Sequence, residues 1–177
     1  MSNTKQLSLI CNILVVAIIS MAACDCRVLQ PNNAELIERT CKQTPNPNLC
    51  VKLLESDPRG RNADLKDLAL IIVDVIATKA KVTLNKIEQL RHGRGGEKEA
   101  IDSCSDKYRA ILEGDVVQAT QALERGNPKF AESALTDSAV EATSCEHRFK
   151  QNSPLTTENN YVRDVANVAT AIVRQLL

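Results

Sequence analysis

Apolar residues recur every three to four positions along most of this chain, the spacing that forms one face of an α-helix. The longest such stretch is predicted to run from an N-cap at Asn62 to Gly93. The last one is predicted to begin near Thr156 or Thr157 and to place its valines and isoleucines on one face. No segment shows the alternation of a convincing β-strand, so the pattern predicts an all-α protein.

Two shorter helices are predicted near the start of the pattern, at residues 33–42 and 46–55. Asn46 suits the N-cap of the second helix, and Pro47 suits its first helical position, where a missing N–H costs nothing. The pair therefore predicts a helical hairpin. Residues 56–60, which contain proline and glycine, are predicted to form the turn that leads into the long helix.

The middle of the chain is predicted to contain three further helices. An amphipathic helix follows the glycine-rich residues 93–96 and is expected to break at Gly114 and Asp115. A short helix then ends at Gly126, and another begins at Pro128. Long helices joined by short connections favour an antiparallel four-helix bundle, with the hairpin as an N-terminal extension.

The N-terminus carries the pattern of a secretory signal peptide. Lys5 is followed by an apolar stretch at residues 7–19 and then by small residues. A bacterial lipoprotein signal is the rival interpretation, but Met21 stands where such signals prefer leucine. The apolar stretch is too short for a spanning helix, so no membrane partner is expected after cleavage. The predicted divisions are a signal peptide (residues 1–26) and one domain (27–177) that comprises the hairpin (27–60) and the bundle (61–177).

Four of the seven cysteines lie beyond this leader, and an even number in an exported chain indicates two disulfides. Three pairings are possible, and geometry favours Cys41–Cys50 with Cys104–Cys145. The first would close the hairpin, and the second would join two bundle helices. A zinc site is the rival use of four cysteines, but the chain lacks a C-x-x-C pair. No metal is expected.

Net charge and motif content argue against several functional classes. The 22 basic and 22 acidic residues balance, so nothing favours nucleic acid as a partner. Neither His92 nor His147 has a recognisable triad partner, and no phosphate-binding or metalloprotease motif occurs. Acidic pairs such as Asp64 and Asp67 fit solvated helix charges. We therefore expect neither an enzyme nor a cofactor-binding protein.

The segment from Gly126 to Phe130 is the most informative one. Gly126 fits the left-handed position after a helix, Asn127 an N-cap, and Pro128 the first helical position. Lys129 then opposes the helix dipole at a cost of about 0.3–1 kcal/mol, which suggests that its charge serves a purpose outside the fold. The alternative is an ordinary solvated lysine beside a Phe130 that packs as a hydrophobic staple.

A carrier of apolar ligands is an alternative of another class. Such carriers usually line their cavities with aromatic and methionine side chains. Both methionines lie in the predicted leader, and the chain has only two phenylalanines, two tyrosines and no tryptophan. We therefore expect a dry core of Leu, Ile, Val and Ala.

Several segments together resemble the plant invertase and pectin methylesterase inhibitor family. The similarity covers essentially the whole of the chain after the leader and includes the order of the four cysteines. It implies a four-helix bundle with an N-terminal helical hairpin and disulfides between consecutive cysteines. The segments that carry it are residues 40–45, Leu49 and Cys50, residues 67–71, and residues 171–177.

Within that family, Pro128, Lys129 and Phe130 look like the motif with which invertase inhibitors enter the active site of acid invertase, a glycoside hydrolase that cleaves sucrose. The resemblance therefore implies a secreted inhibitor of acid invertase (β-fructofuranosidase) that acts in the apoplast, at the cell wall, or in the vacuole. The alternative within the family is inhibition of pectin methylesterase, which the bundle face rather than this turn would contact.

Overall fold

The computed structural model describes residues 33–92, 97–150 and 152–177, and all regular secondary structure in these ranges is helical. The prediction of an all-α fold is therefore confirmed. The predicted signal peptide, residues 1–26, lies outside the described residues.

The N-terminal hairpin consists of α2 (Asn33–Cys41) and α3 (Pro47–Ser56). The Asn46 side chain accepts a hydrogen bond from the Leu49 N–H at 3.2 Å, so the predicted N-cap of α3 is formed. A short 3₁₀ helix, η1 (Pro58–Asn62), continues the chain. Gly60 is required there, since a Cβ atom would lie 2.4 Å from the carbonyl oxygen of Leu54.

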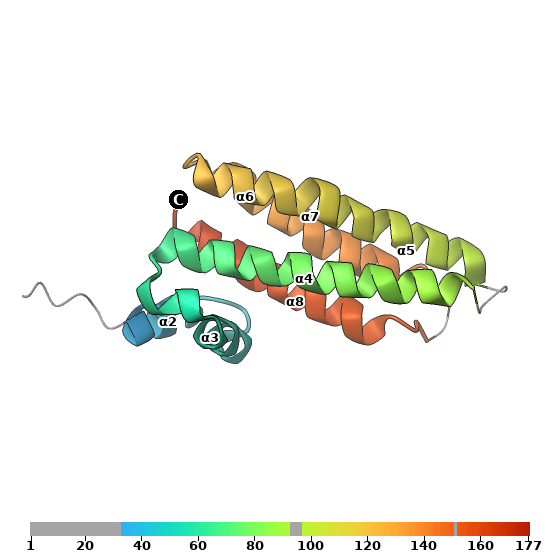
Figure 1. Ribbon diagram of the computed structural model, residues 1–177, viewed down its shortest axis with the longest axis horizontal. Helices are drawn as coiled ribbons and strands as arrows, with labels where there is room; N and C mark the ends of the chain where they lie inside the picture. Colours follow the sequence, from blue (N-terminus) through green and yellow to red (C-terminus); the bar gives the residue numbers. More distant parts are fainter. Residues whose placement is uncertain (1–32, 93–96, 151) are drawn as a thin grey trace, which may run out of the picture. The chain divides into compact units, whose positions relative to one another are not determined.

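Four rods of helix lie side by side after the hairpin, and successive rods run in opposite directions (Figure 1). The second rod joins two α-helices through a π-helical segment, η3, without a break. The rods are α4 (Leu65–Arg91), the composite of α5 (Lys98–Ala110), η3 (Ile111–Asp115) and α6 (Val116–Glu124), then α7 (Pro128–Glu146) and α8 (Thr156–Arg174).

The expected break at Gly114 and Asp115 was wrong. A π-helical turn absorbs the local irregularity while the backbone stays helical, as single π-bulges do within α-helices. Gly114 is exposed and a Cβ atom there would meet nothing within 4 Å, so no close contact requires glycine at this position.

Two helix starts also differ from the sequence-based expectation. Asp64 rather than Asn62 caps α4, and the side chains of Asp64 and Asp67 each accept from the other's backbone N–H in a capping box. Asn62 is instead the last residue of η1. The cap of α8 is Leu155, one residue before the predicted threonines, and its side chain cannot accept a hydrogen bond.

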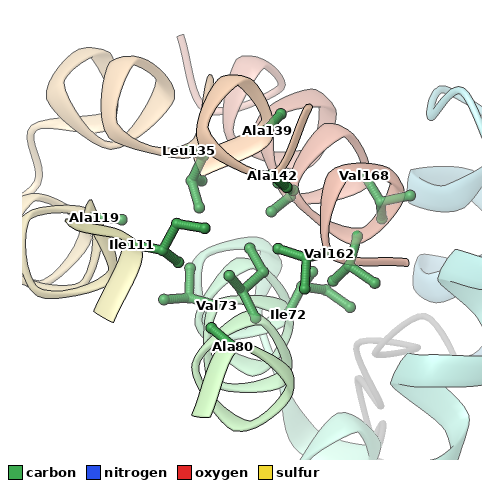
Figure 2. Packing of buried hydrophobic residues seen from close by; sticks show 14 of the residues in the cluster. Ile72, Val73, Ala80, Ile111, Ala119, Leu135, Ala139, Ala142, Val162 and Val168 are labelled. Atoms are coloured by element: carbon green, nitrogen blue, oxygen red, sulfur yellow. The ribbon is translucent and has the colours of Figure 1, made fainter. Parts of the chain in front are cut away.

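The core lies between the four rods and consists mainly of alanine, valine, isoleucine and leucine, as predicted. Figure 2 shows side chains from all four rods converging on one centre. Tyr108 is the largest fully buried side chain, and its hydroxyl donates to Asn159 Oδ1 at 2.8 Å. The core residues labelled in Figure 2 are Ile72, Val73, Ala80, Ile111, Ala119, Leu135, Ala139, Ala142, Val162 and Val168.

Two buried disulfides connect the helices in the predicted pairs. Cys41–Cys50 closes the hairpin with a Cα–Cα distance of 5.5 Å. Cys104–Cys145 ties α5 to the end of α7 with a Cα–Cα distance of 4.8 Å. The Gln175 amide donates to the Thr40 carbonyl at 3.1 Å, which links the end of α8 to the hairpin.

Candidate functional site

The turn between α6 and α7 is held by backbone hydrogen bonds. Gly126 has φ of 72°, a value that a residue with a Cβ atom adopts only with strain. Its N–H donates to the Leu123 carbonyl at 3.2 Å, and the next N–H, of Asn127, donates to the Ala122 carbonyl at 2.8 Å. This is the Schellman pattern of a glycine-terminated helix, so the turn has one well-defined conformation.

Helix α7 begins directly after this turn, with Pro128 at its first position, as predicted. Asn127 occupies the N-cap position, but its side chain makes no capping hydrogen bond. Instead, the Phe130 N–H donates to the backbone carbonyl of Asn127 at 3.1 Å. The start of α7 is therefore fixed by backbone geometry, proline and glycine rather than by a side-chain cap.

Lys129 and Phe130 project from the first turn of α7 into solvent. The Lys129 side chain is 77% exposed, and Phe130 is 63% exposed. Phe130 therefore does not pack as a core residue. It borders a shallow groove of about 350 Å³ on α6, together with the exposed Val117 and with Gln118 and Gln121. An exposed aromatic ring next to a cation presents both apolar and charged contact area to a partner.

Glu132 follows Lys129 by three residues in α7 and is buried, with 9% of its surface exposed. One carboxylate oxygen accepts from Lys129 Nζ at 2.5 Å, and the other accepts from Arg174 Nε at 2.7 Å. Both hydrogen bonds lower the pKa of Glu132 below its usual value, the one from Lys129 more than the one from Arg174. Sequence reasoning missed Arg174, because it lies 42 residues from Glu132 and no local pattern connects the two.

A second carboxylate, on the composite rod, is half-buried. Asp115, in η3, accepts a hydrogen bond from Ser138 Oγ of α7 at 3.2 Å. Burial raises the pKa of Asp115 to about 6, and nearby Asp137 and Glu141 add to the effect. This carboxyl group therefore changes charge within the mildly acidic range.

The other chemically interesting residues do not form a catalytic arrangement. His92 and His147 are C-caps of two helices, α4 and α7. Among the described residues, no cluster of three or more His, Cys, Asp or Glu side chains could hold a metal ion. No described helix has the length and apolar character needed to cross a membrane.

Comparisons with known proteins agree with the fold. Residues 35–172 match the family described as plant invertase/pectin methylesterase inhibitor. Crystal structures of a pectin methylesterase inhibitor from Arabidopsis are similar. One of them, a mutant form, superposes with a TM-score of 0.66 at 23% sequence identity. The match covers 77% of this chain and 94% of the inhibitor's chain. Likeness at this level of identity supports the shared helical fold.

Two curated relatives show closer similarity in sequence. The cell wall / vacuolar inhibitor of fructosidase 1 of Arabidopsis thaliana is 45% identical over 141 residues, which are 80% of this chain and 69% of the relative. The pectinesterase inhibitor of Actinidia deliciosa is 32% identical over 117 residues, or 65% of this chain and 63% of the relative. By its family match, its fold and these relatives, this chain belongs to the plant invertase/pectin methylesterase inhibitor family.

Proposed function

We propose that this protein inhibits plant acid invertase by inserting Lys129 and Phe130, held by Pro128, into the sucrose-binding site. The observation that carries the proposal is the exposure of both side chains at a rigid helix start. The 45% identity to a relative named as an inhibitor of fructosidase supports acid invertase as the target.

The chemistry of the two side chains fits such a target. A retaining glycosidase holds two carboxyl groups about 5–5.5 Å apart in a sugar-binding pocket. Lys129 is a compact cation on a long flexible stem that can reach these carboxylates, and Phe130 can cover apolar surface beside them. Occupying the pocket in this way would compete directly with sucrose.

The backbone around the motif favours tight binding. Ordering a flexible loop on association costs free energy, and a preformed loop avoids that cost. Here Gly126 and Pro128 fix the backbone on either side of Asn127, and α7 continues rigidly from Lys129. The motif is therefore largely preorganised before it meets an enzyme.

The proposal includes a compartment. The signal peptide predicted at residues 1–26 would take the chain into the secretory pathway, and the 45% identical relative is named for the cell wall and the vacuole. Acid invertase of the apoplast or cell wall and that of the vacuole are therefore the two candidate targets. Assaying inhibition of both isoforms in parallel would identify the preferred one.

Inhibition of pectin methylesterase is the second candidate, because the 32% identical relative is named a pectinesterase inhibitor and the similar crystal structures are of pectin methylesterase inhibitors. In that case a face of the bundle rather than the α7 turn would contact the enzyme. The two candidates therefore make opposite predictions for a substitution at Lys129.

A paired inhibition assay tests the proposal. We expect Lys129→Ala to raise the inhibition constant for acid invertase by about 100-fold, or about 2.7 kcal/mol, since losing one partner of a buried charge pair at an interface costs about 2–5 kcal/mol. Its melting temperature should not change. Lys98→Ala is the matched control, because Lys98 is also a first-turn lysine, 74% exposed, and pairs with Asp102 at 2.6 Å.

The assay also separates the alternatives. Unchanged inhibition of invertase by Lys129→Ala would exclude the motif from the mechanism. The second candidate would be established instead if the intact protein does not inhibit invertase but inhibits pectin methylesterase, and if Lys129→Ala still inhibits pectin methylesterase.

A further inference from the structure

Glu132 is shared by two cations that come from opposite ends of their helices. Lys129 lies in the first turn of α7, and Arg174 is the last residue of α8. The Glu132 side chain is 12% exposed, whereas those of Lys129 and Arg174 are 77% and 61% exposed. The carboxylate is therefore the buried centre of the group, and the two cations reach it from the surface.

The helix dipoles treat these two cations differently. A cation at a helix C-terminus is favoured and one at an N-terminus is disfavoured, while a carboxylate in the first turn is favoured. Arg174 and Glu132 are thus placed where their helices stabilise them, and Lys129 is not. If one cation leaves the carboxylate, the dipoles favour the departure of Lys129.

Two cations share one carboxylate, so one of them can leave without exposing an unpaired charge. With Arg174 present, Lys129 can move to carboxylates on an enzyme and leave behind a neutral Glu132–Arg174 pair. Without Arg174, the same movement would leave a nearly buried carboxylate without a cation, which is costly. The abandoned charge would also repel an acidic pocket brought against it.

We propose that Arg174 is a positioning residue of the inhibitor, which retains Glu132 when Lys129 transfers from Glu132 to carboxylates of the target enzyme. The inference rests on the proposed function and adds a residue from the far end of the sequence to the inhibitory site. Arg174 acts through Glu132 and does not need to touch the enzyme.

A double-mutant cycle tests this relation, with inhibition constants measured for the intact protein, Arg174→Gln, Glu132→Gln and the double variant. We expect Arg174→Gln to raise the inhibition constant about 5- to 10-fold in the otherwise unchanged protein, which corresponds to a pairwise coupling of ordinary size. In the Glu132→Gln background, where no charge is abandoned, its effect should be less than about twofold.

Two further measurements guard the interpretation. Arg163→Gln is the control on the same helix, because Arg163 pairs with its neighbour Asp164 at 2.9 Å and not with Glu132. It should leave inhibition unchanged. In the free inhibitor, titration followed by NMR should show the pKa of Glu132 rising in Arg174→Gln, and the melting curve should show that the variant is folded.

The possible results divide clearly. An equal cost of Arg174→Gln in both backgrounds would mean that Arg174 contacts the enzyme itself, and no cost in either would mean that it has no part in inhibition; both overturn the inference. So would an unmoved Glu132 pKa. If Lys129→Ala also leaves inhibition intact, the proposed function is wrong as well. If Lys129→Ala loses inhibition but the effects of Arg174→Gln and Glu132→Gln are additive, only the role of Arg174 is excluded.

Discussion

Two helices of this protein begin with the same dipeptide and end up in different surroundings. Asn46 and Pro47 start α3 in the hairpin, and Asn127 and Pro128 start α7 in the bundle. In the hairpin, the asparagine side chain caps the helix, and the nearby Cys50 is fully buried in a disulfide. In the bundle, the asparagine side chain makes no capping hydrogen bond.

The third helical residue shows the difference most clearly. It is Leu49 in α3, which is partly buried against the core, and Phe130 in α7, which is 63% exposed. An exposed phenylalanine at a rigid position gains nothing for the fold, whereas a packed leucine does. The same Asn-Pro signal can therefore start a helix whose first side chains pack against the core or one whose first side chains are exposed to a partner. Burial of the side chains that follow the proline distinguishes the two cases.

Removing each disulfide should produce the largest effects and separate the two regions energetically. The bonds span 41 residues for Cys104–Cys145 and 9 for Cys41–Cys50. The loop-entropy model therefore gives losses of about 4 and about 2.6 kcal/mol when each pair is replaced by alanine. Chemical denaturation measures both values. A hairpin pair that costs more than the bundle pair would contradict this order.

The same variants also bear on inhibition. Because Lys129 and Phe130 belong to the bundle, replacing Cys41 and Cys50 should leave the inhibition constant within about twofold at a temperature where the bundle is folded. A strong loss of inhibition in that variant would show that the hairpin contributes to the inhibitory site.

Paired alanine substitutions at the third helical residue should have opposite consequences. Phe130→Ala is expected to weaken inhibition by about 2 kcal/mol, roughly 30-fold, with no loss of stability, as for an exposed aromatic anchor. Leu49→Ala should lower stability by about 1–2 kcal/mol, less than a fully buried leucine would, and leave inhibition unchanged. Inhibition assays and melting curves on both variants provide the test. A destabilised Phe130→Ala with normal inhibition would assign Phe130 to the fold.

Much of the fold could be predicted from the sequence because its signals are local or periodic. Apolar residues every three to four positions mark the long helices, and proline and glycine mark the starts and ends at Pro47, Gly126 and Pro128. The break expected at Gly114 failed because glycine only weakens a helix, and neighbouring packing can keep the backbone helical through a π-turn. Asn62 failed as a cap because Asp64, with Asp67, offers a better one.

The candidate site was only partly predictable for a different reason. Lys129 could be singled out because its position opposes the helix dipole, which is a local feature. The partners of Glu132 could not, since Arg174 meets it only after α7 and α8 have packed together. The raised pKa of Asp115 likewise depends on burial against α7, which the sequence does not specify.

Titration should affect the two regions in opposite directions. The raised pKa of Asp115, about 6, means that its contribution to stability is lost as pH rises through 6. We expect a loss of about 1 kcal/mol between pH 5 and 7, less than the full shift implies because the group is only partly buried. Asp115→Asn, which keeps an acceptor for Ser138, should remove this slope of stability against pH, measured by denaturation at several pH values. An unchanged slope would exclude Asp115 as its source.

Asp57 in the hairpin region provides the contrast. The hydrogen bond from Arg59 lowers the pKa of Asp57, so its contribution is present at neutral pH and is lost only on strong acidification, as pH falls below the ordinary aspartate range. Asp57→Asn should therefore leave the slope between pH 5 and 7 as it is.

The smallest expected effect gives the most direct test of the comparison between the two helix starts. Asn46→Ala should cost about 1 kcal/mol, because it removes the acceptor of the Leu49 N–H. Asn127→Ala should cost no more than a few tenths, since no capping bond is lost. Its backbone stays held by the hydrogen bonds with Ala122 and Phe130, so inhibition should stay within about twofold. Asn46→Ser and Asn127→Ser, which keep a capping oxygen, serve as controls in denaturation measurements. Equal losses for the two alanine variants would mean that Asn127 caps α7 in solution, and the contrast between a capped turn and a presented turn would then rest on Leu49 and Phe130 alone.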